Sequence, residues 1–217
     1  MTVRETRART FPSYQPADIR QGFHDAAALF VDRVSHVPRD AWDRPGLGEW
    51  TIRSLVGHTS RALVTVETYL DTGADAAALV GPVDYFLGAL ASPATAAAVA
   101  ERGRQAGAAL GDDPADAMRV LQARVVTRLA TTPDDALVGT PLGGMTLLDY
   151  LPTRTVELTI HTLDLAVALG EVVTLPENAS AITCGVIAEL AYRRELAGPF
   201  LLAATGRRSL PEGFSVL

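Results

Sequence analysis

The sequence contains one cysteine, Cys184, in 217 residues. A single cysteine excludes an internal disulfide and a structural zinc site built from several cysteines. No apolar run reaches the ~18 residues of a membrane-spanning helix, so we expect no membrane segment. The basic residues near the N-terminus are not followed by an apolar stretch, which argues against a secretory signal. These absences predict a cytoplasmic protein.

The sequence has no lysine, and its net charge is −6 with a pI near 5.2. No stretch of the sequence forms a basic stripe. A nucleic-acid-binding protein would normally carry such a stripe, so we expect no nucleic-acid partner. The sequence also has no glycine-rich phosphate loop, nucleophile elbow or Cys-x-x-Cys motif. A hydrophobic content of 48% with 20% charged residues is typical of an ordinary globular protein.

Helical periodicity dominates, and no stretch alternates convincingly as a strand would. We expect a loose region at 74–91 and a turn-rich segment at 131–144 with a short extended piece. The expected helices are 16–37, 51–70, 93–110, 114–130, 146–169 with a kink or restart at Pro152, 176–196, and a short one after Pro199. The pattern predicts an all-α fold, a four-helix bundle with additional short helices. We expect one domain over residues 1–217, with a short C-terminal extension from about residue 171.

Three residues carry the chemical signal: His58, Glu157 and His161. Glu157 and His161 are four residues apart in a helical segment, so their side chains share one face. His58 lies in a second predicted helix and is able to supply a third ligand. Two histidines and one carboxylate form a ligand set of catalytic zinc, with one position left for water or substrate. Helix bundles build metal sites from facing helices in this way.

Each of these residues also has a plainer interpretation. Glu157 and His161 fit a solvated pair that supports the helix, and His58 fits a hydrogen-bonded core or surface histidine. The apolar surroundings favour the metal site, because a buried polar stripe needs partners. By spacing, Asp164 is placed either to orient His161 or to form a surface salt bridge. Arg154 fits a binding group for an anionic substrate, a binding group for the carboxylate of a thiol cosubstrate, or an ion pair with a neighbouring acid.

The remaining candidates have ordinary explanations. His24 and His36 lack partners at ligand spacing, and His36 lies near a helix C-terminus, where it complements the dipole. Cys184 has no flanking histidine or basic residue and is expected to be a small buried side chain. Trp50, directly before the Thr51 N-cap, is expected to pack on Leu55 as a hydrophobic staple.

Two segments resemble a known family. Residues 50–58, Trp-Thr-Ile-Arg-Ser-Leu-Val-Gly-His, and residues 154–166, Arg-Thr-Val-Glu-Leu-Thr-Ile-His-Thr-Leu-Asp-Leu-Ala, are similar to the two signatures of the mycothiol-dependent maleylpyruvate isomerase family. That family belongs to the DinB/YfiT-like metalloenzyme superfamily. The closing residues 202–216 also resemble the ending of many actinobacterial members.

The resemblance implies a DinB/YfiT-like four-helix bundle with a divalent metal, typically Zn²⁺, held by His58, Glu157 and His161. It also implies mycothiol as a cosubstrate, whose sulfur takes the open metal position. The metal would ionise the thiol, and the thiolate would attack a small electrophile. Addition, rotation and elimination would be a cis–trans isomerisation, and addition or displacement alone would be an S-transfer.

The sequence leaves other functions open. One is a non-catalytic metal- or ligand-binding bundle, such as a resistance or sequestration protein. Another is an interaction domain in which the motif is a remnant. For the enzyme we expect only small-molecule partners, an electrophile and a thiol, and a monomer or homodimer.

Overall fold

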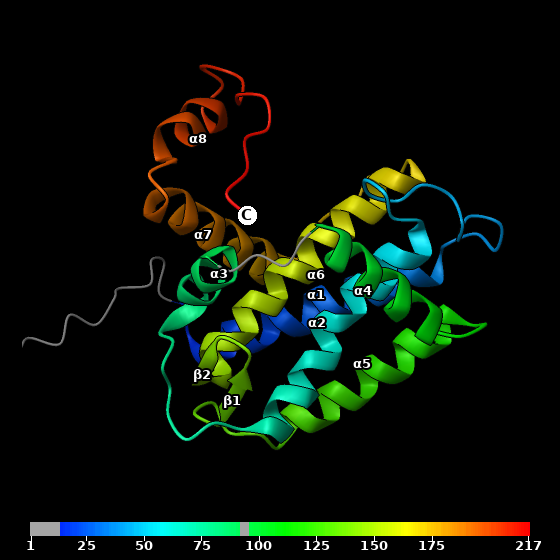
Figure 1. The fold of residues 1–217 in the computed structure, drawn as a ribbon, viewed down its shortest axis with the longest axis horizontal. Coiled ribbons are helices and arrows are strands. Elements are labelled where there is room, and N and C mark those ends of the chain that lie inside the picture. Colours follow the sequence, from blue (N-terminus) through cyan, green and yellow to red (C-terminus); the bar gives the residue numbers. More distant parts are fainter. Residues whose placement is uncertain (1–13, 92–95) are drawn as a thin grey trace, which may run out of the picture.

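Helices make up most of the chain in the computed structural model, which describes residues 14–91 and 96–217 (Figure 1). In chain order the elements are α1 (Pro16–Ser35), α2 (Ile52–Thr72), α3 (Gly81–Ala91), α4 (Ala96–Ala109), α5 (Pro114–Ala130), β1 (Leu137–Thr140), β2 (Gly143–Thr146), α6 (Leu147–Leu169), α7 (Glu177–Arg193) and α8 (Ala197–Ala204). The predicted all-α fold class is confirmed. Among the described residues, no helix combines the length and apolar character that a bilayer crossing requires.

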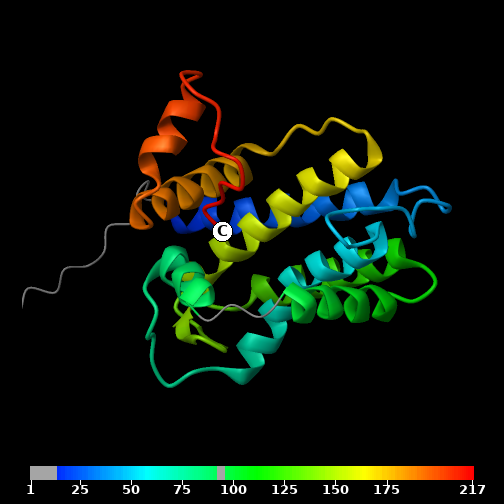
Figure 2. The same ribbon diagram turned by 45° about the horizontal axis from the view of Figure 1, so that its top comes forward.

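The main hydrophobic core lies between α1, α2, α5 and α6, which form the bundle. Each helix contributes fully buried side chains to it, for example Phe30, Leu63, Val125 and Leu158. α6 runs through the middle, in contact with α1 on one side and α2 on the other (Figure 2). The two helices with the candidate ligands, α2 and α6, are therefore direct neighbours.

The ends of these two helices are fixed by local sequence. The Thr51 side chain caps α2 by accepting a hydrogen bond from the Ser54 amide at 3.2 Å. Thr146 caps α6 in the same way, with the Asp149 amide at 3.1 Å. α6 ends at Gly170, whose φ of 71° is the left-handed conformation that favours glycine. These caps set the helical phase on which the candidate site depends.

α6 runs without interruption through Pro152, so the helix does not restart there, and the predicted kink stays a prediction. Pro152 is the sixth residue of the helix, and it removes only one backbone hydrogen bond, near the N-terminal end. The hydroxyl of Thr153 donates to the Tyr150 carbonyl at 2.6 Å and that of Thr155 to the Leu151 carbonyl at 3.1 Å. These hydroxyls add hydrogen bonds within the helical turn beside the proline.

The region 74–91, expected to be loose, contains α3. α3 packs on α6 and α7, with Val83 and Phe86 buried. Its core contacts are to helices far along the chain, which is why its own short sequence gave no clear signal. The helix predicted at 93–110 is observed as α4, and the start of that prediction falls outside the described residues.

The turn-rich segment at 131–144 contributes to an antiparallel hairpin of β1 and β2, in which buried Val138 faces buried Met145. Gly144 is part of β2 rather than of a simple turn. Its carbonyl accepts hydrogen bonds from the amides of Ala78 and Leu79 at 2.8 and 3.0 Å. A side chain at Gly144 would collide with the Ala76 carbonyl, so this close approach requires glycine.

α4 packs along α2 through glycine contacts. A side chain at Gly57, the residue before His58, would collide with the backbone of Gly107 on α4. A side chain at Gly103 would lie 2.9 Å from Nε1 of Trp50. The absence of side chains at these positions brings α4 close to the part of α2 that carries His58.

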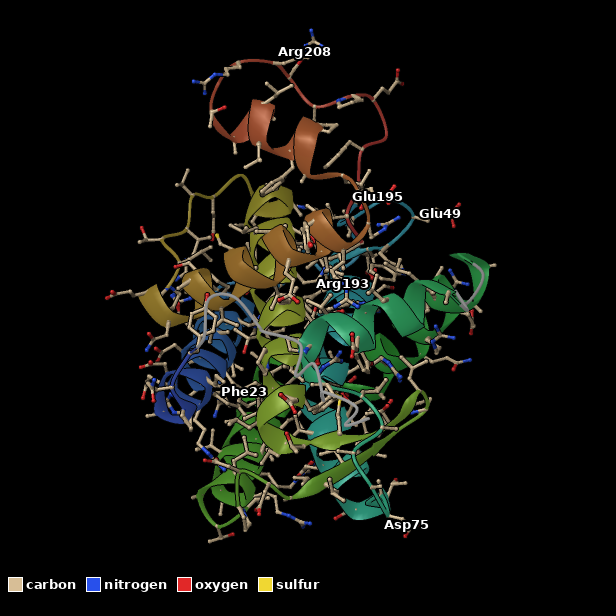
Figure 3. The ribbon with its side chains drawn as sticks, turned by 90° about the vertical axis from the view of Figure 1, so that its left-hand side faces the viewer. Phe23, Glu49, Asp75, Arg193, Glu195 and Arg208 are labelled. Atoms are coloured by element: carbon tan, nitrogen blue, oxygen red, sulfur yellow. The ribbon has the colours of Figure 1, made fainter. Side chains whose placement is uncertain are left out.

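The chain after α6 packs partly on the bundle. α7 contacts α1 and α6, whereas α8 contacts α7 and carries no buried residue. α8 projects away from the bundle, and Arg208 lies far from Phe23 of α1 (Figure 3), whereas the end of the tail returns to α7, where Val216 is buried (Figure 1). The helix predicted at 176–196 ends at Arg193, and the next helix begins at Ala197 rather than after Pro199.

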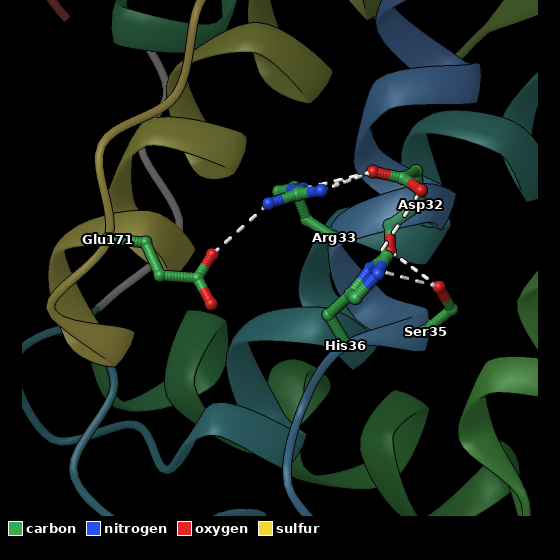
Figure 4. A network of polar contacts seen from close by, with 5 residues as sticks. All are labelled: Asp32, Arg33, Ser35, His36 and Glu171. Atoms are coloured by element: carbon green, nitrogen blue, oxygen red, sulfur yellow. Dashed lines mark hydrogen bonds and ion pairs between the residues drawn. The ribbon is translucent and has the colours of Figure 1, made fainter.

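A polar network joins the end of α1 to the residue that follows the α6 cap (Figure 4). Arg33 bridges Asp32 at 2.5 Å and Glu171 at 3.3 Å. His36 is the C-cap of α1, and its Nδ1 lies 2.7 Å from the Asp32 carbonyl. These contacts link the C-terminal end of α1 to the residue that follows α6 and so stabilise the packing of the two helices.

Candidate metal centre

α2 and α6 bring His58, Glu157 and His161 together. Oε2 of Glu157 lies 4.0 Å from Nε2 of His58 and 3.4 Å from Nε2 of His161. The three donor atoms all lie within 4.8 Å of one another. Around a tetrahedral ion with bonds of ~2.1 Å, donors would be ~3.4 Å apart. The donor set therefore fits a divalent metal after small side-chain adjustments.

The three side chains are largely shielded but not sealed. Their exposed fractions are 22% for His58, 27% for Glu157 and 13% for His161. In the described part of the chain this is the single group of three or more His, Cys, Asp or Glu residues arranged to hold a metal. Its partial exposure leaves a route for a small molecule to reach it.

Glu157 is held as a carboxylate although burial favours its neutral form. Burial raises the pKa of Glu157, but the hydrogen bond from His161 and the positive charge of Arg154 outweigh it and lower the pKa to about 2. Burial also disfavours a charged His161, but hydrogen bonds to Asp164 and Glu157 raise its pKa to about 9. Without a metal, His161 at neutral pH is an imidazolium between two carboxylates.

His58 behaves in the opposite way. Burial, followed by the charge of His161, lowers the pKa of His58 to about 4, and Arg61 and Arg102 act in the same direction. His58 is therefore a neutral imidazole at neutral pH, the form that coordinates a metal. The proton on His161 therefore supplies one positive charge at the centre and competes with a metal ion for this histidine.

Asp164 lies where the spacing placed it, one turn beyond His161. Its Oδ2 is 2.9 Å from Nδ1 of His161. This contact fixes the ring so that Nε2 faces Glu157. A carboxylate on the far nitrogen of a histidine is the usual arrangement for a metal ligand.

Trp50 forms one wall of the site, which the sequence did not reveal. Its ring centroid lies 4.4 Å from that of His58, with the planes tilted by 33°, and 6.4 Å from that of His161. The position of Trp50 directly before the Thr51 N-cap predicted only a contact with Leu55, which lies one helical turn before His58. That expected staple remains a prediction.

Arg154 lies one turn before Glu157 and is only 7% exposed. Its Cζ lies 5.2 Å from the ring centroid of Tyr85 and 5.0 Å from that of Tyr150. The ion-pair alternative is not observed, because Arg154 forms no salt bridge with any residue in the described ranges. Its positive charge instead acts on Glu157 from a distance.

The other candidates lie away from the centre. Cys184 is exposed on α7, so the expectation of a buried cysteine is wrong: its side chain points away from the face of α7 that packs on α1 and α6. His24 is an exposed residue 3.7 Å from Asp25. Neither belongs to the group that could hold a metal.

Comparison with known proteins supports the resemblance. Residues 23–166 match the family model of the mycothiol maleylpyruvate isomerase N-terminal domain. This matched range includes all three candidate ligands. Searches of curated proteins and of solved structures find no match. The match covers more than half of the chain, including all of α2 and α5 and most of α1 and α6, so the chain belongs to the mycothiol maleylpyruvate isomerase N-terminal domain family.

Proposed function

We propose that this protein is a metal-dependent enzyme that joins a low-molecular-weight thiol, mycothiol, to a small electrophile, by S-transfer or in a cis–trans isomerisation. The observation that supports it most is the convergence of His58, Glu157 and His161 from two helices. The donor set suits a divalent ion, and Zn²⁺ is the first choice for two histidines and one carboxylate.

A divalent metal at this position would supply a Lewis acid that lowers the pKa of an approaching thiol. Asp164 holds the His161 ring and its tautomer. The Trp50 ring lies against that of His58 and covers one side of it. Arg154 places a buried positive charge one helical turn from Glu157.

The reaction follows from thiolate chemistry. The thiol proton leaves to solvent, and the sulfur lone pair forms a C–S bond to one carbon of an activated double bond. The displaced π electrons move onto the activating group, which leaves a single bond about which the molecule rotates. Return of these electrons expels the thiolate and completes an isomerisation, whereas protonation of the carbon completes an S-transfer. A positive charge such as that of Arg154 would stabilise the developing anion.

The experiment uses untagged protein loaded with Zn²⁺. Mycothiol is supplied with maleylpyruvate for isomerisation, and with an epoxide and an alkyl halide for S-transfer. We expect turnover with at least one electrophile, and its loss in His58→Ala. The control is His24→Ala, which alters an exposed histidine of α1.

Stoichiometric zinc binding without turnover would instead favour a non-catalytic metal-binding bundle. Full activity and full zinc content in His58→Ala would contradict the proposed site.

A further inference from the structure

The helix α8 has an apolar surface that the rest of the described chain leaves uncovered. Its sequence, Ala-Gly-Pro-Phe-Leu-Leu-Ala-Ala, contains no polar side chain, yet α8 carries no buried residue. Leu201 is 58% exposed and Leu202 is 38% exposed. A helix that is apolar all round is normally buried, and a helix as short as α8 is marginal in water without tertiary contacts. Both features indicate that a partner covers α8.

The C-terminal arm, residues 195–217, is fixed at its base and exposed at its tip. At the base, Val216 is buried in the cluster formed by α3, α6 and α7. Nη1 of Arg194 donates a hydrogen bond to the Ser215 carbonyl at 3.3 Å. Beyond α8, by contrast, residues 205–213 are all exposed. Because its base is anchored, the arm holds its apolar surface in place before a partner binds, which lowers the entropic cost of association.

The two ends of the arm carry opposite charges. Figure 3 shows Glu195 at the base and Arg208 at the tip, and Arg207 precedes Arg208 in the chain. All three side chains are exposed, and none of them forms an ion pair with another described residue. Glu195 has a φ of 60°, the one positive φ outside glycine in the described ranges, and it turns the chain between α7 and α8. The arm therefore presents an acidic base and a basic tip on either side of its exposed leucines.

A second copy of the arm complements both ends. In a twofold-symmetric contact, each residue of one copy meets a residue of the other, and the same pair recurs on the opposite side of the axis. Leu201 lies midway in the sequence between Glu195 and Arg207. When two arms lie antiparallel with the axis beside Leu201, Glu195 of each copy faces the tip arginines of the other. The leucines of the two α8 helices then cover each other.

We propose that this protein forms a homodimer through antiparallel pairing of its C-terminal arms. The contact is separate from the candidate metal centre, whose ligands lie on α2 and α6. An anionic lipid surface or an acidic protein would match Arg207 and Arg208 but would repel Glu195. A second copy matches all three charges and the apolar surface between them.

The test measures the mass and the dissociation constant of the full chain by sedimentation velocity, from about 1 to about 500 µM. We expect a dimer that dissociates at the low end of this range. Leu201→Asp should weaken dimerisation at least ~100-fold, because two carboxylates would be buried beside the axis. Leu201 is exposed in the single chain, so circular dichroism should show an unchanged helical content. The control is Arg119→Glu, which alters an exposed arginine of α5.

Charge reversal identifies the partner. The variant Glu195→Arg and the variant that combines Arg207→Glu with Arg208→Glu should each self-associate about 10- to 100-fold more weakly than the wild type. In both variants like charges face each other at the two ends of the contact. An equimolar mixture of the two variants should form a heterodimer about as tight as the wild-type dimer, because opposite charges face each other again.

Wild-type protein that stays monomeric at about 500 µM would overturn the proposal. A dimer that is indifferent to Leu201→Asp, or a mixture of the charge-reversed variants that forms no heterodimer, would overturn it as well. Vesicles of phosphatidylcholine and phosphatidylserine test the lipid alternative. A monomer that binds these vesicles, and loses this binding in Arg207→Glu with Arg208→Glu, would assign the arm to a lipid surface instead.

Discussion

Asp164→Asn should weaken zinc binding in a manner that depends on pH. In the wild type, Oδ2 of Asp164 lies 2.9 Å from Nδ1 of His161, and both side chains are mostly shielded, at 25% and 13% exposure. Loss of such a carboxylate typically lowers metal affinity about 10- to 100-fold, or about 1.4 to 2.8 kcal/mol. The same carboxylate also increases the affinity of His161 for a proton, which competes with the metal.

The direction of the pH effect follows from the raised pKa of His161. Because that pKa is about 9, protons weaken apparent zinc binding by the wild type about tenfold for each pH unit below 9, or about 100-fold at pH 7. In Asp164→Asn the pKa of His161 is lower, so protons compete less. The apparent zinc affinity of the wild type should therefore exceed that of the variant most at pH 9. The ratio of the two affinities should shrink as the pH falls.

The assay is competition with a chelator at buffered free zinc, from pH 6 to 9. Asp25→Asn is the matched control, because it alters an exposed His–Asp pair on α1. Equal affinities of Asp164→Asn and wild type at pH 9, or a ratio that does not change with pH, would refute the reasoning.

Three further results are expected. Zinc binding at pH 7 should release close to one proton from His161, whose pKa is about 9, as measured by calorimetry in buffers of different ionisation enthalpy; no release would mean that His161 is already neutral. Trp50→Ala should lower zinc affinity about 3- to 10-fold, because His58 loses its stacking partner, a contact typically equivalent to about 0.5–1.5 kcal/mol; unchanged affinity would assign Trp50 to packing alone. Gly57→Ala should lower the free energy of unfolding by about 1–3 kcal/mol in denaturant titrations, because its methyl group meets the α4 backbone, whereas Gly198→Ala, which meets nothing within 4 Å, should not destabilise; equal effects would contradict the close α2–α4 contact.

The helices of the bundle were predictable because their signals are local. Thr51 and Thr146 are good N-caps, and Gly170 ends α6 where the apolar periodicity stops. A short extended piece was expected within 131–144, where β1 lies, but α3 and the pairing of β1 with β2 were not predicted because they depend on distant partners. α3 is stabilised by α6 and α7, and Gly144 of β2 is required by the backbone of residues 76–79.

The candidate site divides in the same way. Glu157, His161 and Asp164 lie on one helix, so their spacing alone placed them together. The sequence offered His58 as a third ligand from a second helix, but its convergence with Glu157 and His161 depends on the packing of α2 on α6, which spacing does not reveal. The contacts of Trp50 and Tyr85 join other elements to the site, so no local pattern predicted them.

The most direct test of the metal centre is metal content per chain, measured by elemental analysis of untagged protein purified without chelator and then equilibrated with zinc. We expect one zinc per chain in the wild type and in His24→Ala, and none retained in His58→Ala or His161→Ala that remain folded. Wild-type protein that takes up no zinc, or a folded His161→Ala that retains one zinc per chain, would contradict a metal held by His58, Glu157 and His161.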